Sequence, residues 1–157
     1  MTKIIHPVAG AVALTTIATF WLCTALSELF ASDASITTVK TAIPWGFLLL
    51  IPALAVTGGS GFFLAGGRRA GLIGAKIRRM PFIAGNGILI LIPAALFLAS
   101  KAKAAEFDTT FYAVQTLELF AGATNIVLLG LNMRDGFKMK GRFRVRQPDR
   151  FNTKPML

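Results

Sequence analysis

Four long apolar stretches constrain this sequence more than any other feature. They cover about residues 6–30, 41–67, 81–100 and 111–133. Each reaches the roughly 20 residues that an α-helix needs to cross the hydrocarbon core of a bilayer. With 54% hydrophobic residues in a chain of 157, the apolar surface exceeds what a soluble domain of this size buries. We therefore expect an all-α integral membrane protein, with a four-transmembrane-helix bundle in residues 1–134 and a short basic cytoplasmic tail in residues 135–157.

Basic residues gather in the N-terminus, in the connection between the second and third stretches, and in the tail. These segments hold 14 of the 17 Lys and Arg residues: Lys3; Arg68, Arg69, Lys76, Arg78 and Arg79; and Arg134, Lys138, Lys140, Arg142, Arg144, Arg146, Arg150 and Lys154. Because cytoplasmic flanks of membrane helices are rich in Lys and Arg, we expect both termini in the cytoplasm, as an N-in/C-in protein. The net charge of +10 then reflects topology and not nucleic-acid binding. The expected location is a bacterial inner (cytoplasmic) membrane, with multiple passes.

The last apolar stretch carries polar residues at helical spacing. Gln115, Asn125 and Asn132 stand at −3, +7 and +14 relative to Glu118, which places all four on one helix face. A carboxylate within a span costs roughly 2.5–3.5 kcal/mol on insertion scales, so this face is expected to point into the bundle. Asn86 enters from the opposite direction and should reach a depth close to that of Asn125, where an interhelical amide hydrogen bond can form.

Two interpretations of Glu118 remain open. In the first, the polar stripe is structural and fixes helix packing at about 0.6–2 kcal/mol per bond. In the second, Glu118 carries a proton or cation, or contacts a quinone or another lipid-soluble ligand. A membrane-embedded glutamate in a four-helix unit is similar to the small multidrug antiporters, and that resemblance implies transport. Here, however, the acid lies in the last helix, and no second titratable group is evident in mid-membrane.

The sequence lacks the residues that many catalytic and cofactor sites need. His6 is the only histidine and Cys23 the only cysteine, so one chain cannot hold a bis-histidine haem, a disulfide or a cysteine metal site. The Gly58-Gly59-Ser60-Gly61 run departs from nucleophile-elbow and phosphate-loop patterns. Small residues four apart, such as Ala55 and Gly59, instead favour close helix packing. We therefore identify no catalytic or metal-binding residues and leave the cofactors open. We expect that the chain has no catalytic activity of its own.

Asp135-Gly136 is a turn signal, and after it the tail alternates between two kinds of residue. Every even position from 138 to 146 is basic, and the odd ones are apolar or glycine. This period of two predicts an extended strand over Phe137–Arg146, with its cations on one face. A lone strand is unstable, so it should pair with a partner or lie on anionic headgroups at about 1 kcal/mol per cation. A disordered polybasic tail that serves only topology is the alternative.

Together these features predict a non-catalytic integral membrane subunit that packs within or anchors a larger inner-membrane complex, such as an energy-transducing one. The alternative is a small transporter or proton- or quinone-linked carrier that uses Glu118. Expected partners are the lipid bilayer, including anionic lipids, and other membrane-protein subunits or a second copy of the chain. The candidate contacts with a partner or anionic lipid are Arg68, Arg69, Lys76, Arg78, Arg79, Lys138, Lys140, Arg142, Phe143, Arg144 and Arg146.

Overall fold

Helices account for all the regular secondary structure in residues 2–67 and 71–142, which are the residues that the computed structural model describes. In chain order the elements are α1 (Thr2–Phe30), α2 (Asp33–Ala65), α3 (Gly71–Asn86), η1 (Gly87–Leu91), α4 (Ile92–Lys103) and α5 (Thr109–Arg142). The short η1 segment is a π-helical turn between α3 and α4, so these three elements form one helical rod. The structure thus contains four helical rods that are long and apolar enough to cross a membrane, as predicted.

The helices are longer than the apolar stretches suggested. Helix α2 begins at Asp33, not near residue 41, and the third rod covers Gly71–Lys103, not 81–100. Ser32 precedes α2 with extended backbone angles, and the Asp33 carboxylate lies in the first turn, where it stabilises the positive end of the helix dipole. As a consequence, Lys40 and the basic residues 76–79 lie on helices and not in connections.

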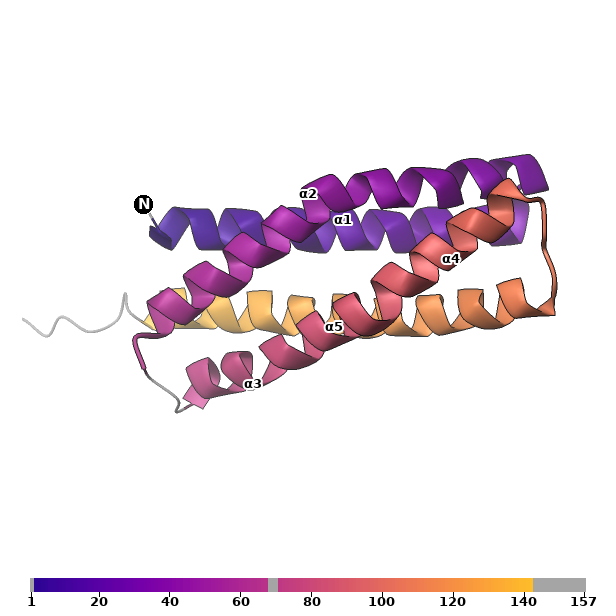
Figure 1. Ribbon diagram of the computed structural model, residues 1–157. Coiled ribbons are helices and arrows are strands. Elements are labelled where there is room, and N and C mark those ends of the chain that lie inside the picture. Colours follow the sequence, from indigo (N-terminus) through magenta and orange to yellow (C-terminus); the bar gives the residue numbers. More distant parts are fainter. Residues whose placement is uncertain (1, 68–70, 143–157) are drawn as a thin grey trace, which may run out of the picture.

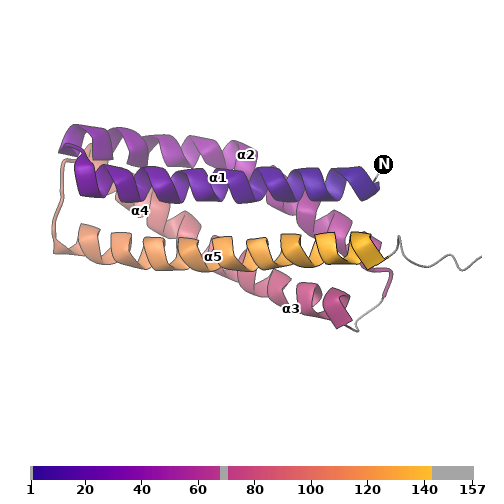
Figure 2. The same ribbon diagram turned by 180° about the vertical axis from the view of Figure 1, so that it is seen from behind.

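The four rods pack as an antiparallel ring (Figures 1 and 2). Helix α1 packs on α2 and on α5, α4 packs on α2 and on α5, and α3 packs mainly on α5. Helices α2 and α5 are diagonal in this ring and are not direct neighbours over their described residues. The start of α1, the end of α2, the start of α3 and the end of α5 all lie at the same end of the molecule (Figure 1). The described parts of the three basic segments therefore lie at one end, and the assignment of this end to the cytoplasm is a prediction.

The predicted extended tail is wrong for Phe137–Arg142, because α5 continues through these residues as a helix. Asp135 is 1% exposed and pairs with Arg79 on α3, and the Lys76 ammonium lies beside Gly136. These contacts hold the helix against α3 where Asp135-Gly136 was expected to form a turn. The remaining predicted strand residues, 143–146, lie outside the described residues.

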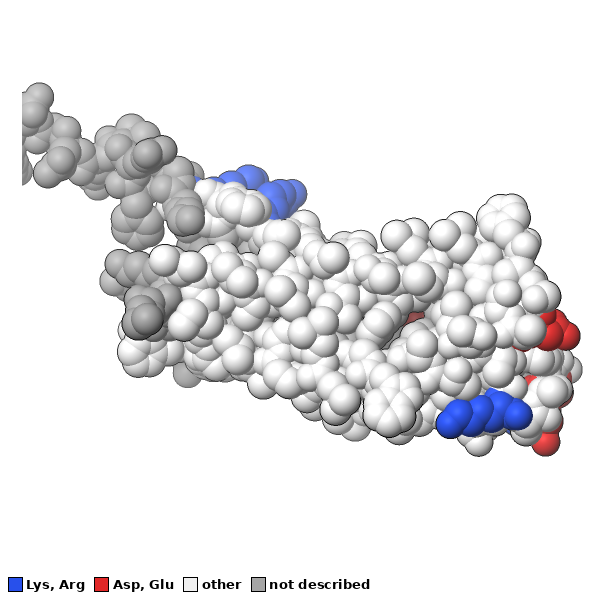
Figure 3. All heavy atoms as spheres, turned by 90° about the horizontal axis from the view of Figure 1, so that it is seen from above, with Lys and Arg blue, Asp and Glu red and all other residues white. Residues whose placement is uncertain are grey.

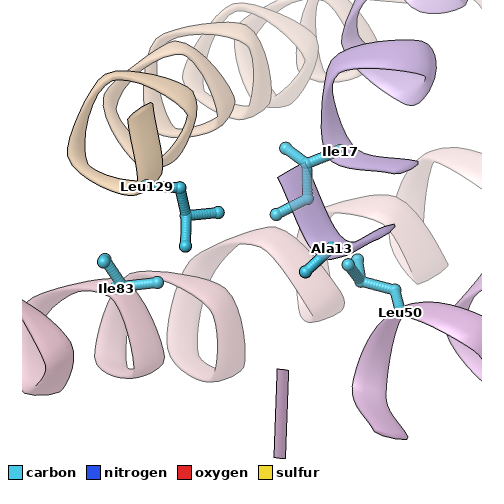
Figure 4. Packing of buried hydrophobic residues seen from close by; sticks show 5 residues of the cluster. All are labelled: Ala13, Ile17, Leu50, Ile83 and Leu129. Atoms are coloured by element: carbon cyan, nitrogen blue, oxygen red, sulfur yellow. The ribbon is translucent and has the colours of Figure 1, made fainter. Parts of the chain in front are cut away.

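Two apolar clusters form the core. The central one brings together Ala13, Ile17, Leu50, Ile83 and Leu129, which belong to four different helices (Figure 4). The other contains Ile36, Leu98, Ala102 and Phe111, near the end of the bundle opposite the termini. Gly46 allows close packing of α1 on α2, since a Cβ at this position would lie 2.1 Å from a ring carbon of Phe20. Most large apolar side chains elsewhere face outward, as expected for a lipid-facing surface.

Candidate functional site

Lys40 is the most deeply buried charged group of the interior. Its side chain has no exposed surface, and its Nζ donates a hydrogen bond to Glu118 Oε2 at 2.5 Å. The Glu118 side chain is itself only 12% exposed. Because α2 and α5 are diagonal in the ring, the Lys40 side chain crosses the interior of the bundle to reach this carboxylate. The pair therefore supplies the partner that an acid within a span requires.

Two further polar side chains belong to the same region. Glu28, near the end of α1, lies within electrostatic range of both Lys40 and Glu118. Its Oε1 atom is buried and has no hydrogen-bond partner among the described residues. Gln115 is 4% exposed and lies one helical turn from Glu118, and both of its amide atoms also lack partners in these ranges. We call Glu28, Lys40, Gln115 and Glu118 the acid–lysine cluster.

A cavity of about 60 Å³ adjoins the acid–lysine cluster. Its lining comes from α1, α2, η1, α4 and α5 and is apolar except for a few groups, among them Glu118 and Thr24. Trp21, also in the lining, donates its Nε1 hydrogen to the Leu119 carbonyl at 2.9 Å. Such a volume holds a few water molecules, but it is far below the roughly 300 Å³ at which drug-sized ligand pockets begin. In Figure 3 a small recess interrupts the uncharged surface, with an acidic group visible at its base.

The predicted amide contact between the third and fourth rods is confirmed. Asn86 Nδ2 donates to Asn125 Oδ1 at 2.9 Å and to the Ala121 carbonyl at 2.8 Å, and Asn125 Nδ2 donates to the Ile83 carbonyl at 3.3 Å. Asn125 is 1% exposed. These bonds satisfy polar groups in the middle of the bundle and lock the rotation of α5 against α3.

A second ion pair lies on the same two helices, nearer the termini. Arg79 donates to Asp135 Oδ2 at 2.7 Å and to Asn132 Oδ1 at 3.3 Å, and Asn132 and Asp135 are both buried. The Arg79 guanidinium is thus bound within the chain and stabilises the α3–α5 packing. Its predicted contact with a partner or anionic lipid stays a prediction.

His6 forms a third set of polar contacts close to that ion pair. Its Nδ1 lies 3.1 Å from the Thr57 carbonyl and 3.0 Å from Ser60 Oγ, and Lys76 Nζ lies 3.5 Å from its Nε2. Since a carbonyl only accepts, Nδ1 carries the hydrogen, and Nε2 is left to accept from the lysine. His6 therefore connects α1 with α2 and α3.

The connection between α4 and α5 carries its own charge cluster. Lys101 Nζ donates to Glu106 Oε2 at 2.8 Å and to Asp108 Oδ2 at 2.7 Å, and the Phe111 backbone N–H donates to Asp108 Oδ1 at 2.8 Å. The hydrogen bond from Lys101, aided by that from the Phe111 amide, holds the pKa of Asp108 below its usual range. This cluster caps the start of α5.

The other predicted contact residues lie partly on the surface of the helices and partly outside the described residues. Arg78 and Lys138 are exposed, and Lys140 and Arg142 lie on α5. The rest fall outside the described residues: Arg68, Arg69, Phe143, Arg144 and Arg146.

Lys40 and Asp135 are site residues that the sequence analysis did not identify. Lys40 was assigned to a connection and Asp135 to the tail, because the limits of the helices were drawn where each apolar stretch ended. Two signals could have found them. Ser32-Asp33 is a helix start signal that extends α2 over Lys40. Arg79 precedes Asn86 by seven residues, and Asn132 follows Asn125 by seven, so an antiparallel pairing of Asn86 with Asn125 also brings Arg79 to Asn132. Asp135 lies one helical turn after Asn132, so the same pairing brings it to Arg79.

The fold and the site together define a multi-pass membrane protein whose interior charges are largely paired within the chain. Comparisons with models of protein families, with curated proteins and with solved structures find no match for this sequence.

Proposed function

We propose that this chain is a non-catalytic subunit that packs within, or anchors, a larger complex of a bacterial inner membrane. The observation that carries the proposal is a face of small residues on α2 that has no neighbour among the described residues. Ala55 and Gly59 are exposed, and a Cβ built on Gly58 or Gly59 would meet nothing within 4 Å. Glycine weakens a helix by about 1 kcal/mol relative to alanine, and in a membrane it allows another helix to approach closely.

The paired interior charges agree with a structural subunit. Glu118 and Asp135, the two carboxylates of α5, are each bound by a basic side chain from another helix. In each case one carboxylate oxygen accepts a hydrogen bond from the cation, which offsets the cost of placing an acid inside the bundle. These pairs favour a role in holding the bundle together.

The exposed basic side chains at the end that holds both termini fit contacts with anionic headgroups. Arg78, Arg134 and Lys138 are all exposed there. In a membrane with anionic lipids, each contributes about 1 kcal/mol of attraction near the surface. The subunit would then be held by lipid at this end and by its partner along α2.

An assembly test can separate the α2 face from the rest of the surface. The double variant Ala55→Leu/Gly59→Leu should fold normally, since both positions are exposed and a Cβ at Gly59 meets no described residue within 4 Å. It should nevertheless lose its partners or second copy on extraction in mild detergent. Ala84→Leu, an exposed alanine on α3, is the matched control and should keep them. Equal particle size and composition for all three proteins would refute docking through α2.

A small proton-linked carrier is the second candidate, and one observation favours it. Lys40 supplies the second interior titratable group that a proton path requires, and Glu118 borders a cavity. In proteoliposomes that contain a pH-sensitive dye, a carrier should release an imposed proton gradient, whereas the Glu118→Gln variant should not. If the purified wild-type protein leaves the gradient at the level of empty vesicles, the carrier function is refuted and the subunit role stands.

A further inference from the structure

The acid–lysine cluster contains more negative than positive groups. Lys40 and Glu118 form one ion pair, while Glu28 is a second carboxylate in electrostatic range of both. Its Oε1 atom is buried without a partner among the described residues. With all three groups charged, the cluster would carry one excess negative charge inside a membrane protein, where unpaired charge is costly.

Among the described residues, the neighbouring elements do not supply a cation for this excess charge. The other charged group acting on Glu28 is Asp33 at the start of α2, which adds negative charge. The buried residues of α4, which packs on both α2 and α5, are Ala94, Ala95, Leu98, Ala99 and Ala102. The Lys101 ammonium is bound by Glu106 and Asp108.

A second observation independently indicates that the cluster takes a ligand. Gln115 lies on the same face of α5 as Glu118 and is only 4% exposed. Neither its amide oxygen nor its amide nitrogen has a hydrogen-bond partner among the described residues. In folded proteins, the large majority of buried side-chain amides have a hydrogen-bond partner. The adjacent cavity, which Thr24 also lines, gives small polar species a way toward Glu118.

We propose that Glu28, Lys40 and Glu118 form a proton-binding site that holds one exchangeable proton per chain. A proton suits the site better than a metal ion, because the Lys40 ammonium already occupies a Glu118 oxygen and repels a second cation. Binding takes a proton from bulk water and forms one O–H bond on a carboxylate, with no other bond broken. The protonated carboxyl can then donate a hydrogen bond to a buried amide oxygen, such as that of Gln115. The site goes beyond the subunit role and does not depend on it.

Infrared difference spectroscopy of the purified full chain in detergent tests this proposal, through the C=O stretching band of protonated carboxyl groups. At a pH where exposed acids are ionised, the wild-type protein should show a band equivalent to one protonated carboxyl. Glu28→Gln should abolish the band, because the Lys40–Glu118 pair is then neutral. Lys40→Met should double it, because two carboxylates then lack a cation.

Glu106→Gln is the matched control, since it removes an exposed acid at the same end of the bundle and should leave the band unchanged. Glu28→Gln deletes an oxygen without a hydrogen-bond partner, so it should fold, and a melting curve checks this. A wild-type protein without the band, or a folded Glu28→Gln variant that keeps it, would overturn the proposal. So would loss of the wild-type band when choline chloride is replaced by sodium chloride at constant pH, since a metal ion would then be the occupant.

Discussion

The ammonium of Lys40 lies 2.5 Å from Glu118 Oε2 and links two helices that are diagonal in the bundle, across 78 positions of the sequence. This contact requires Lys40 and Glu118 to face the interior of the bundle at similar depths. Buried ion pairs add little net stability compared with well-packed apolar residues, but the loss of one partner is costly. The pair therefore selects one packing of the helices over others.

Removal of one partner of this pair should destabilise the protein. Lys40→Met leaves the Glu118 carboxylate buried without its cation, and we expect a loss of about 3 kcal/mol in the free energy of unfolding. The double variant Lys40→Met/Glu118→Leu should recover most of this loss. Unfolding curves in mixed detergent micelles measure both. A double variant as unstable as the single one would show that the pair is not an isolated unit.

The amide contact in the middle of the bundle should contribute a smaller amount. Asn125→Leu removes the bond with Asn86 and the bond to the Ile83 carbonyl, so we expect a loss of roughly 1–2 kcal/mol in unfolding free energy. Thr124→Val is the control, because its hydroxyl is exposed and bonds only within its own helix. If both substitutions cost the same, the interhelical bonds do not determine packing here.

Two adjacent arginines should behave differently. Arg79→Gln breaks the buried pair with Asp135, so it should lower the unfolding midpoint with little dependence on salt. Arg78→Gln changes an exposed side chain, so it should leave that midpoint unaltered and weaken binding of anionic lipid in a salt-dependent way. Thermal melts and lipid co-purification at two salt concentrations distinguish them. Identical behaviour of the two variants would contradict the structural assignment.

Membrane orientation can be tested with cysteines at exposed positions after Cys23→Ser. An impermeant thiol reagent should label Ala34→Cys and Ala104→Cys in sealed right-side-out membrane vesicles, because these positions lie at the end predicted to be external. Arg78→Cys and Lys138→Cys should react only after lysis. The reverse pattern would place both termini outside the cytoplasm.

The Asp108 carboxylate at the start of α5 should stay ionised at a lower pH than an ordinary aspartate. The pKa of Asp108 is lowered by its hydrogen bond from Lys101, so the folded state favours the ionised form. Its contribution is present above the ordinary aspartate pKa and is lost as the pH falls through the lowered value in the folded protein. Carboxyl carbon shifts in an NMR titration should show Asp108 titrating below its usual range, and Lys101→Met should move that pKa upward. An unchanged pKa in the variant would rule out the lysine as the cause.

Local patterns in the sequence correctly indicated four apolar helices and the inward face of α5. Asn86 and Asn125 could be paired from their depth alone, because helix rise and direction place both in the same layer. The tail shows the limit of this reasoning. Its period of two predicts a strand, yet through Arg142 the backbone stays helical, where each amide finds a carbonyl one turn away and Asp135 binds Arg79.

What the sequence by itself determined is thus the number of spans, their alternating direction and the polar face of the last one, because hydropathy and helical periodicity act over short distances. Only the tertiary structure decided which cation meets each buried acid. Lys40 reaches Glu118 because α2 begins early enough to carry it inside the bundle and because α5 stands diagonally across from it. The Lys40–Glu118 contact depends on the packing of the whole ring of helices, which no local sequence pattern in α2 or α5 encodes.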